Sequence, residues 1–440
     1  MSHLLAGRAQ MGTSLGFHIV FASLGVGLPV LIAIAHFLGL RHDDPVWMRL
    51  AARLTRAFAV LVVVGVVSGI VISIELVLLW PRFASAAGPV VGLPFSIETY
   101  FFFIEAIFLS LYVFGRRRLS PWLHWATLIP VALGGLGSAV IVVAANAWMN
   151  TPVGFRFAHG RFLDPQPYRA ILNPSMPAET FHMVAAAYVA TGLTVAGVYA
   201  FSMLRGRRGL YERRGLALGM SLAVLWIVPL GVGGDLAGRT IARDQPVKLA
   251  AAEGLATTQR NAPLTLGGLA DQNGHVRFGL KVPDGLSLLV GRDPNTRITG
   301  LDSVPVDQRP PVAVVHSAFD LMVLIGGALT ALVGGFWFAY WRRPRWLERR
   351  AVLVAVVASG PLAFLAVEAG WTVTEVGRQP WIVYGLVRTS AAITGSPLVG
   401  LMFALFTLLY AVLSAVTVLA LGSELRLLPR RALAGLRPAE

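Results

Sequence analysis

The sequence predicts an all-α integral membrane protein with about nine transmembrane helices. Of its 440 residues, 56% are hydrophobic and only 13% are charged, whereas a typical soluble domain is about 45–50% apolar and about 25% charged. Apolar runs of about 20 residues, the length that crosses the hydrocarbon layer of a bilayer, recur along the whole chain. These observations argue against a large soluble protein, because too few polar residues remain to cover its surface.

Nine segments are long and apolar enough to be membrane helices. We predict them at residues 12–40, 55–80, 94–115, 122–146, 179–204, 215–235, 312–341, 351–372 and 396–421. The first segment is longer than the apolar core of a cleavable signal peptide, which has about 7–15 residues. We therefore interpret it as the first membrane helix.

Basic residues gather in the loops that follow the odd-numbered helices. These loops and the C-terminal tail hold more than half of the 37 Lys and Arg residues. Positive residues in short loops favour the cytoplasmic side. We therefore expect the N-terminus outside and the C-terminus in the cytoplasm. The net charge of +15 follows from this topology and does not indicate a nucleic-acid partner.

A long segment of mixed polarity, residues 236–311, separates the sixth and seventh predicted helices. We expect it on the outer side, where a connection of this length is usually functional or mobile. It divides the chain into residues 1–235 with helices 1–6, the loop itself, and residues 312–440 with helices 7–9 and a cytoplasmic tail.

The chain has no cysteine, which excludes disulfides, thiolate metal sites, iron–sulfur clusters and haem attached through a Cys-x-x-Cys-His motif. Any metal must therefore be bound by His, Met or carboxylate. Such residues occur inside the predicted helices, where an ionisable group is costly and by default indicates function. They are His18, Glu98, Glu105, His182, Asp320, Met322, Glu368 and Glu375.

The predicted topology brings several of these residues to a common depth. His18, Glu98, His182, Met322 and Glu375 all fall in the outer half of the bilayer, although they are far apart in the sequence. Such convergence is typical of a shared site. For each residue alone the alternatives stay open, because a histidine can bridge helices and a methionine commonly packs in an apolar core.

Glu98 and Glu105 are seven residues apart, so two helical turns place them on one face with Glu105 about 10 Å deeper. Two carboxylates in line are suited to proton transfer from the cytoplasmic side. In the long loop, Lys248 and Glu253 would by default belong to a solvated surface.

Several segments together resemble subunit I of the cytochrome bd quinol oxidases. They are RAQ with GFHIVF around His18, IETYFFFIEAIF with Glu98 and Glu105, GSAVIVVAANAWMNTPVG with Ser138, Asn146 and Trp148, FHMVAAAYVATG with His182, QPVKLAAAEG with Lys248 and Glu253, FDLMV with Met322, and EAGWTVTEVGRQPW with Trp371, Glu375 and Arg378. These segments run from residue 8 to residue 381 and cover most of the chain. GRQPW with the upstream Trp and Glu is the most specific.

The resemblance implies three haems. They are a low-spin haem b, a high-spin haem b and haem d, or a further haem b in place of haem d. His182 and Met322 match the ligands of the low-spin haem. His18 and Glu375 match the axial ligands at the oxygen site, without indicating which ligand holds which haem.

Other residues acquire roles from the same resemblance. Lys248 and Glu253 match a pair that binds quinol in the long loop. Arg8, Trp371 and Arg378 are expected to steady haem propionates and electron transfer.

The implied activity is that of a terminal oxidase in a bacterial inner membrane. It oxidises quinol at the outer face and reduces O2 to water at the haem site. Protons from the cytoplasm would pass Glu105 and Glu98, so that the reaction charges the membrane without a pump. The implied partners are a homologous subunit II and a small single-helix subunit.

Two departures from the family pattern are visible. Asp320 stands where the family often has an arginine, two residues before the ligand methionine, which bears on redox balance and quinol preference. The long loop also lacks the insertion that some members of the family carry, so it is of the shorter of the two types.

Three alternatives remain from the sequence. The first is a variant oxidase with only b-type haems. The second is a transporter that uses the intramembrane carboxylates for proton coupling. The third is a non-catalytic assembly factor, against which the retention of every ligand-type residue argues.

Overall fold

The structure is a computed structural model that describes residues 3–426, with side chains to residue 422. Within these residues, nine segments are long and apolar enough to cross a membrane. Their helices are α1 (His3–Arg41), α2 (Pro45–Leu79), α3 (Pro81–Phe114), α4 and α5 (Pro121–Ala126 and Leu128–Asn150), α7 (Met176–Leu204), α8 (Leu210–Asp244), α11 (Val312–Arg342), α12 (Arg350–Val376) and α14 (Val399–Arg426). The all-α class and the nine predicted helices are confirmed. The basic tail after Arg426 lies outside the described residues.

Several helices extend beyond the apolar runs from which they were predicted. α2 begins at Pro45 rather than at residue 55, because Asp44 caps it and accepts a hydrogen bond of 2.8 Å from the backbone N–H of Val46. α3 begins at Pro81 and continues through Pro89 and Pro94. Transmembrane helices tolerate internal prolines, since neighbouring groups satisfy the freed carbonyls. The sequence prediction instead began this helix at residue 94.

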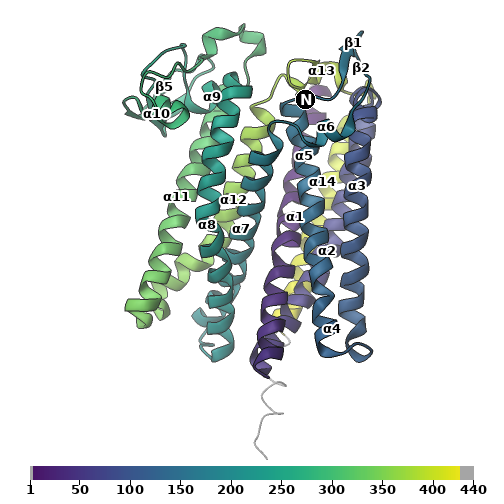
Figure 1. Cartoon of the computed structure of the whole chain (residues 1–440), viewed down its shortest axis with the longest axis vertical. Coiled ribbons are helices and arrows are strands. Elements are labelled where there is room, and N and C mark those ends of the chain that lie inside the picture. Colours follow the sequence, from purple (N-terminus) through teal and green to yellow (C-terminus); the bar gives the residue numbers. More distant parts are fainter. Residues whose placement is uncertain (1–2, 427–440) are drawn as a thin grey trace, which may run out of the picture.

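The membrane helices form two neighbouring groups (Figure 1). α7, α8, α11 and α12 make one group, in which α12 packs against both α7 and α11. α1, α2, α3, α5 and α14 make the other, and α1 and α5 also contact α7. α7 is the most enclosed span, with 78% of its most apolar stretch buried, whereas the corresponding value is 11% for α3 and α14. The latter two helices therefore present broad apolar faces to lipid or to a partner.

The long connection between α8 and α11 is a folded unit rather than a structureless loop. It contains α9 (Pro246–Glu253), β3 (Leu264–Leu266), β4 (Leu269–Ala270), β5 (Val276–Arg277), β6 (Leu280–Val282), α10 (Gly285–Gly291), η2 (Leu301–Ser303) and η3 (Val306–Gln308). β3 pairs with β6 and β4 with β5, both antiparallel. Leu249, Leu286 and Leu301 belong to a hydrophobic core that this unit shares with the ends of α11 and α12. α8 continues to Asp244, so the first residues of the predicted 236–311 segment are helical.

The two ends of the bundle differ in character. The folded connection lies at the end where α1 begins, beside two hairpins and two short helices (Figure 1). These are β1 (Arg156–Ala158), β2 (Arg161–Leu163), α6 (Pro167–Ile171), β7 (Trp381–Val383), β8 (Val387–Arg388) and α13 (Thr389–Ala392). The other end carries η1 (Gly115–Arg117), η4 (Pro344–Glu348) and the arginine-rich loops. We call these the loop end and the arginine end.

α7 and α8 approach closely at a pair of glycines. A Cβ atom at Gly192 would come 2.7 Å from the carbonyl oxygen of Gly219, which is backbone and cannot yield. Small residues at such a crossing are typical of packed membrane helices. The contact holds α8 firmly against the helix that carries His182.

We expect Gly192→Val to force α7 and α8 apart and to lower stability by about 1–3 kcal/mol, the usual cost of overpacking. Thermal unfolding of the purified complex, followed by circular dichroism, measures this change. Gly231→Val in α8 is the matched control, because nothing lies within 4 Å of a Cβ at that position. Equal effects of the two substitutions would contradict the assignment.

Candidate functional site

His18 on α1 is oriented by a hydrogen bond to α2. Its Nδ1 lies 2.9 Å from the hydroxyl oxygen of Ser68. The single proton of that hydroxyl is donated to a backbone carbonyl of α2, at 2.9 Å from Val64 or 3.0 Å from Gly65. A hydroxyl that donates to the backbone has lone pairs left to accept from Nδ1–H of His18, and in that tautomer the neutral ring carries its lone pair on Nε2. Metal-ligating histidines are commonly oriented in this way.

His182 on α7 has the same arrangement with a different partner. Its Nδ1 donates to the carbonyl oxygen of Leu230 on α8, at 3.2 Å. A carbonyl can only accept, so the lone pair of the neutral ring again lies on Nε2. Beside the ring is Gly234, where a Cβ atom would come 3.4 Å from Cε1 of His182. The glycine leaves room next to the imidazole.

Met322 on α11 lies beside another glycine. A Cβ at Gly370 of α12 would come 3.0 Å from the sulfur of Met322. The next residue, Trp371, has a buried indole N–H without a hydrogen-bond partner among the described residues. Since α12 packs against both α7 and α11, it lies between the helices that carry His182 and Met322.

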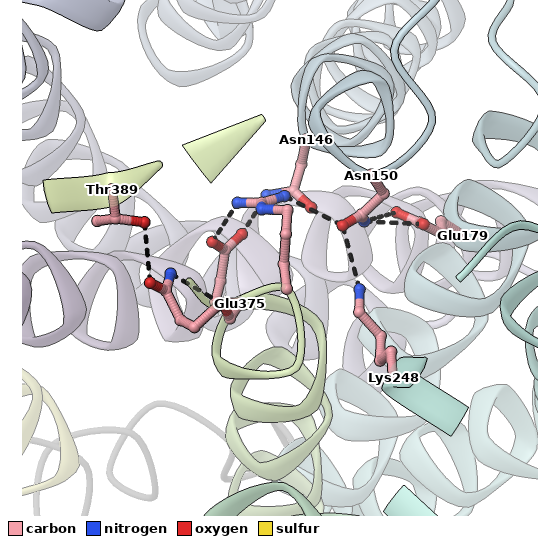
Figure 2. Close-up of polar contacts among 8 residues, drawn as sticks. Asn146, Asn150, Glu179, Lys248, Glu375 and Thr389 are labelled. Atoms are coloured by element: carbon pink, nitrogen blue, oxygen red, sulfur yellow. Dashed lines mark hydrogen bonds and ion pairs between the residues drawn. The ribbon is translucent and has the colours of Figure 1, made fainter. Parts of the chain in front are cut away.

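Glu375 near the end of α12 is fixed by two donors (Figure 2). Arg378 donates from Nη2 to one carboxylate oxygen at 2.6 Å, and the side-chain amide of Asn146 on α5 donates to the other oxygen. Arg378 is only 2% exposed, so this ion pair lies in the interior. Each carboxylate oxygen keeps a further lone pair, and ligation by Glu375 is compatible with both contacts.

Asn150 connects this pair to the long connection (Figure 2). Its side-chain oxygen accepts from Arg378 and from the ammonium of Lys248, each at 3.1 Å. Its amide nitrogen donates to both carboxylate oxygens of Glu179, at 3.0 and 3.2 Å. A continuous polar network thus joins α5, α7, α9 and α12. Two cations and two carboxylates balance one another within it.

Lys248 and Glu253 on α9 do not form a solvated surface, and that default interpretation was wrong. Both are 2% exposed. They also face different neighbours, because five residues of helix place them on different sides. Lys248 points into the Asn150 network, whereas Glu253 accepts from the backbone N–H of Thr265 and lies near Asp320 of α11.

Burial shifts the pKa values of both residues towards neutrality. It lowers the pKa of Lys248 to about 7, a shift that the negative charge of Glu179 opposes. It raises the pKa of Glu253 to about 8, and the charge of Asp320 adds to the effect. Both groups can therefore exchange protons at neutral pH, which suits acid–base chemistry.

Asp320, the departure from the family pattern, has a histidine partner. Its carboxylate lies 3.2 Å from Nε2 of His316, one turn earlier on α11. The other ring nitrogen of His316 lies 2.7 Å from the carbonyl oxygen of Ala252 on α9. His316, the partner of Asp320, therefore joins α11 to the folded connection.

The paired glutamates of α3 both face α5. Ser138 donates to Glu98 at 2.7 Å. Glu105 lies beside Gly134, where a Cβ atom would come 2.9 Å from the Cβ of Glu105. The shared face expected from their spacing is therefore observed.

Not every residue singled out in the sequence joins the network, and some members were missed. Trp148 is buried in an aromatic cluster with Phe155 and Phe162. Arg8 is half-buried on α1. Glu75 on α2, which is fully buried and accepts from Gln10 at 3.0 Å, was not predicted.

Asn150 and Glu179 were also missed. The available signal was a carboxylate three residues before His182 and an asparagine at the end of the WMN motif. An asparagine at a helix end is ordinarily a cap, so only its contacts reveal its role.

The sequence matches the family described as "Cytochrome bd terminal oxidase subunit I" over residues 6–429. The chain belongs to this family. The bd oxidase structure from Geobacillus thermodenitrificans superposes with a TM-score of 0.93 at 40% identity, over 97% of this chain and 99% of that chain. A Bacillus subtilis relative, provisionally named as a cytochrome bd menaquinol oxidase subunit I, is 36% identical over 96% of both chains.

Relatives with lower sequence identity belong to the same family. The Bacillus subtilis cytochrome bd ubiquinol oxidase subunit 1 is 29% identical over 97% of this chain and 94% of its own. The Escherichia coli cytochrome bd-II ubiquinol oxidase subunit 1 is 26% identical over 88% of both. Membership of the cytochrome bd family makes this chain a haem-carrying membrane subunit of a quinol oxidoreductase that also has a subunit II.

The donor set fits haem in a cytochrome bd subunit. Among the described residues, no three His, Asp or Glu side chains meet as a metal site made of protein ligands alone. A haem iron needs only one or two protein ligands, since the porphyrin supplies the others. His18 and His182 each use Nδ1 in a hydrogen bond, which leaves Nε2 for an iron, and glycines let the side chains of His182 and Met322 pack closely against the neighbouring helices.

We expect Ser68→Ala to release the His18 ring and to lower haem affinity by about 10- to 100-fold, the usual effect of losing the hydrogen bond behind a ligand. Pyridine haemochrome analysis of the purified complex measures the haem content. Ser73→Ala is the matched control on the same helix, because Ser73 is exposed and donates only to its own backbone. Unchanged haem content in Ser68→Ala would contradict the orientation argument.

Proposed function

We propose that this chain is the catalytic subunit of an electrogenic quinol oxidase that oxidises quinol at the loop end and reduces O2 to water. One observation carries the proposal. Two histidines on different helices each use Nδ1 in a hydrogen bond that leaves the Nε2 lone pair available for iron. The bound haems supply electron transfer and the reduction of O2. The protein supplies ligands, orientation and protons.

In this proposal, His182 and Met322 hold a low-spin haem b. A haem held by both side chains would supply electron transfer rather than oxygen binding. His18 and Glu375 hold the high-spin haem b and haem d, or a further haem b in its place.

Other side chains would orient these groups. Trp371, with its unpartnered indole N–H, lies next to Gly370 at the Met322 sulfur. Arg378 is the counter-ion of Glu375. Arg8 would bind propionate near the start of α1.

We infer that quinol docks at the loop end. A hollow of about 140 Å³ there is lined by Val247, Gly377, Trp381 and Tyr384, among others. Val247 precedes Lys248, whose methylene groups lie against Gly377. Glu253 does not line this hollow and lies on another side of α9, but we propose it as the base that receives the quinol proton, because a buried carboxyl with a pKa of about 8 holds a reactive carboxylate fraction near neutral pH.

Glu105 and Glu98 carry protons inward from the arginine end, which we assign to the cytoplasm by the positive-inside rule. Quinol protons leave at the opposite face. Each turnover then moves charge across the membrane without a pump. We place the N-terminus outside, and we propose a homologous subunit II and a small single-helix subunit as partners.

Optical spectra and oxygen uptake of the purified complex test this function. We expect quinol-dependent O2 uptake, a low-spin haem b band that His182→Ala removes, and a chlorin band in the red. Absence of the chlorin band alone would favour the variant with only b-type haems. Protein purified in mild detergent without any haem would favour the transporter and end the proposal.

We expect the turnover rate at saturating quinol to rise with pH towards about 8, because the deprotonated form of Glu253 is the base. Glu253→Gln cannot accept a proton, so it should lower turnover by about 100-fold or more and abolish this pH dependence. Steady-state oxygen uptake, recorded from about pH 6 to about pH 9 so that the range includes the raised pKa of Glu253, measures this dependence.

Asp293→Asn, an exposed carboxylate of the same folded connection, is the control. It should keep the wild-type profile. A wild-type profile in Glu253→Gln would exclude Glu253 as the base.

A further inference from the structure

A buried cluster of three polar aromatic side chains lies near the arginine end of the bundle. The hydroxyl of Tyr112 on α3 is 2.9 Å from Nδ1 of His36 on α1. Nε2 of His124 on α4 is 2.7 Å from the backbone carbonyl of Tyr112. The Tyr112 and His124 rings stack at 4.5 Å, and the His36 and His124 rings meet edge-on at 5.2 Å. All three side chains are less than 9% exposed.

Tyr112 continues the line of the two glutamates on α3. It follows Glu105 by seven residues, as Glu105 follows Glu98. Seven residues are close to two helical turns, so the three side chains form one stripe with steps of about 10 Å. The stripe leads from the Glu98–Ser138 contact towards the arginine end.

A surface hollow at the arginine end lies close to this cluster, although none of the three cluster residues lines it. Its volume is about 360 Å³, and Asp43, Asp44, Ala52 and Arg116 contribute to its wall. One turn above Ala52 on α2, the hydroxyl of Thr55 contacts the side chain of Tyr112.

Polar and charged side chains from the neighbouring elements also face the cluster. Arg116, one turn after Tyr112, is within electrostatic reach of both His36 and Tyr112. Thr55 faces Tyr112 from α2, and His124 faces both rings from α4. Hydroxyl and imidazole groups can each accept one proton while giving up another. The cluster therefore has the chemistry of a relay and not only of a contact between helices.

We propose that His36, Tyr112 and His124 form the entrance of the proton path that supplies Glu105 and then Glu98. This inference rests on the proposed function. A proton from water in the hollow binds the Thr55 hydroxyl, which gives its own proton to the Tyr112 hydroxyl, and Tyr112 in turn gives its own proton to Nδ1 of His36. His36 then releases the proton on Nε2 towards Glu105, and water bridges the remaining two turns. No electrons move, and each group regains its starting charge when the ring tautomer resets.

The test uses the complete oxidase in sealed vesicles, with O2 uptake and proton uptake from the arginine end recorded together. The main variant is Tyr112→Phe, which keeps the stacked ring and removes only the hydroxyl that meets His36. We expect turnover and proton uptake to fall together by about 10-fold or more. The quinol KM and the haem spectrum should stay unchanged, and the solvent deuterium isotope effect should increase.

His36→Gln and Thr55→Val extend the test, so that poor assembly of one variant leaves the others to decide. Tyr100→Phe and His42→Gln are the controls. Tyr100 is a 70% exposed tyrosine of α3, and His42 lies at the exposed end of α1. Both should behave as wild type.

The outcomes separate the two proposals. If assembled Tyr112→Phe and Thr55→Val both kept wild-type turnover and an unchanged isotope effect, the proposal that the cluster is the proton entrance would be overturned. Loss of haem from every cluster variant, with normal kinetics per remaining haem, would show a structural contact only and would also overturn it. A wild-type complex that contains haem but takes up no O2 with quinol would instead overturn the proposed function, and the entrance with it.

Discussion

The interior of this protein depends on one constraint: a charged or strongly polar group away from water must find partners. Asn150 shows how the constraint is met. Its side-chain oxygen accepts from Lys248 and Arg378, and its amide donates to Glu179. One neutral amide thereby contacts three charged groups, from α7, from α9 and from the turn after α12. The position of Glu375, and so of any iron that it binds, depends on this arrangement through Arg378.

The same constraint explains why two histidines in an apolar bundle are oriented rather than merely tolerated. In His18 and His182 the demand for a partner is met at Nδ1, by a serine hydroxyl and by a carbonyl. That leaves one directed lone pair on each ring. The orienting groups come from α2 and α8, so ligand geometry is set by packing between helices and not by the ligand helix alone.

The sequence predicted the membrane class and all nine helices, because apolar runs of spanning length are a local property. It did not predict where α2 and α3 begin or where α8 ends, since caps and proline turns such as Asp44–Pro45 at the start of α2 lie outside the apolar runs. The seven-residue spacing of Glu98 and Glu105 gave their common face correctly. The different surroundings of Lys248 and Glu253, and the contacts of Asn150, are features of the tertiary structure. They depend on which helices pack together, and no local pattern contains that information.

The folded connection between α8 and α11 has hydrophobic contacts of its own around Leu249 and Leu286. Its most exposed part is the strand β6, with Phe278 just before it at 93% exposure. It is attached to the membrane bundle through α9, by way of Lys248 and the carbonyl of Ala252, and also through β4 and α10, which contact α11 and α8. The exposed strand β6 and Phe278 can therefore change in sequence without disturbing the contacts that hold the folded connection to the helices.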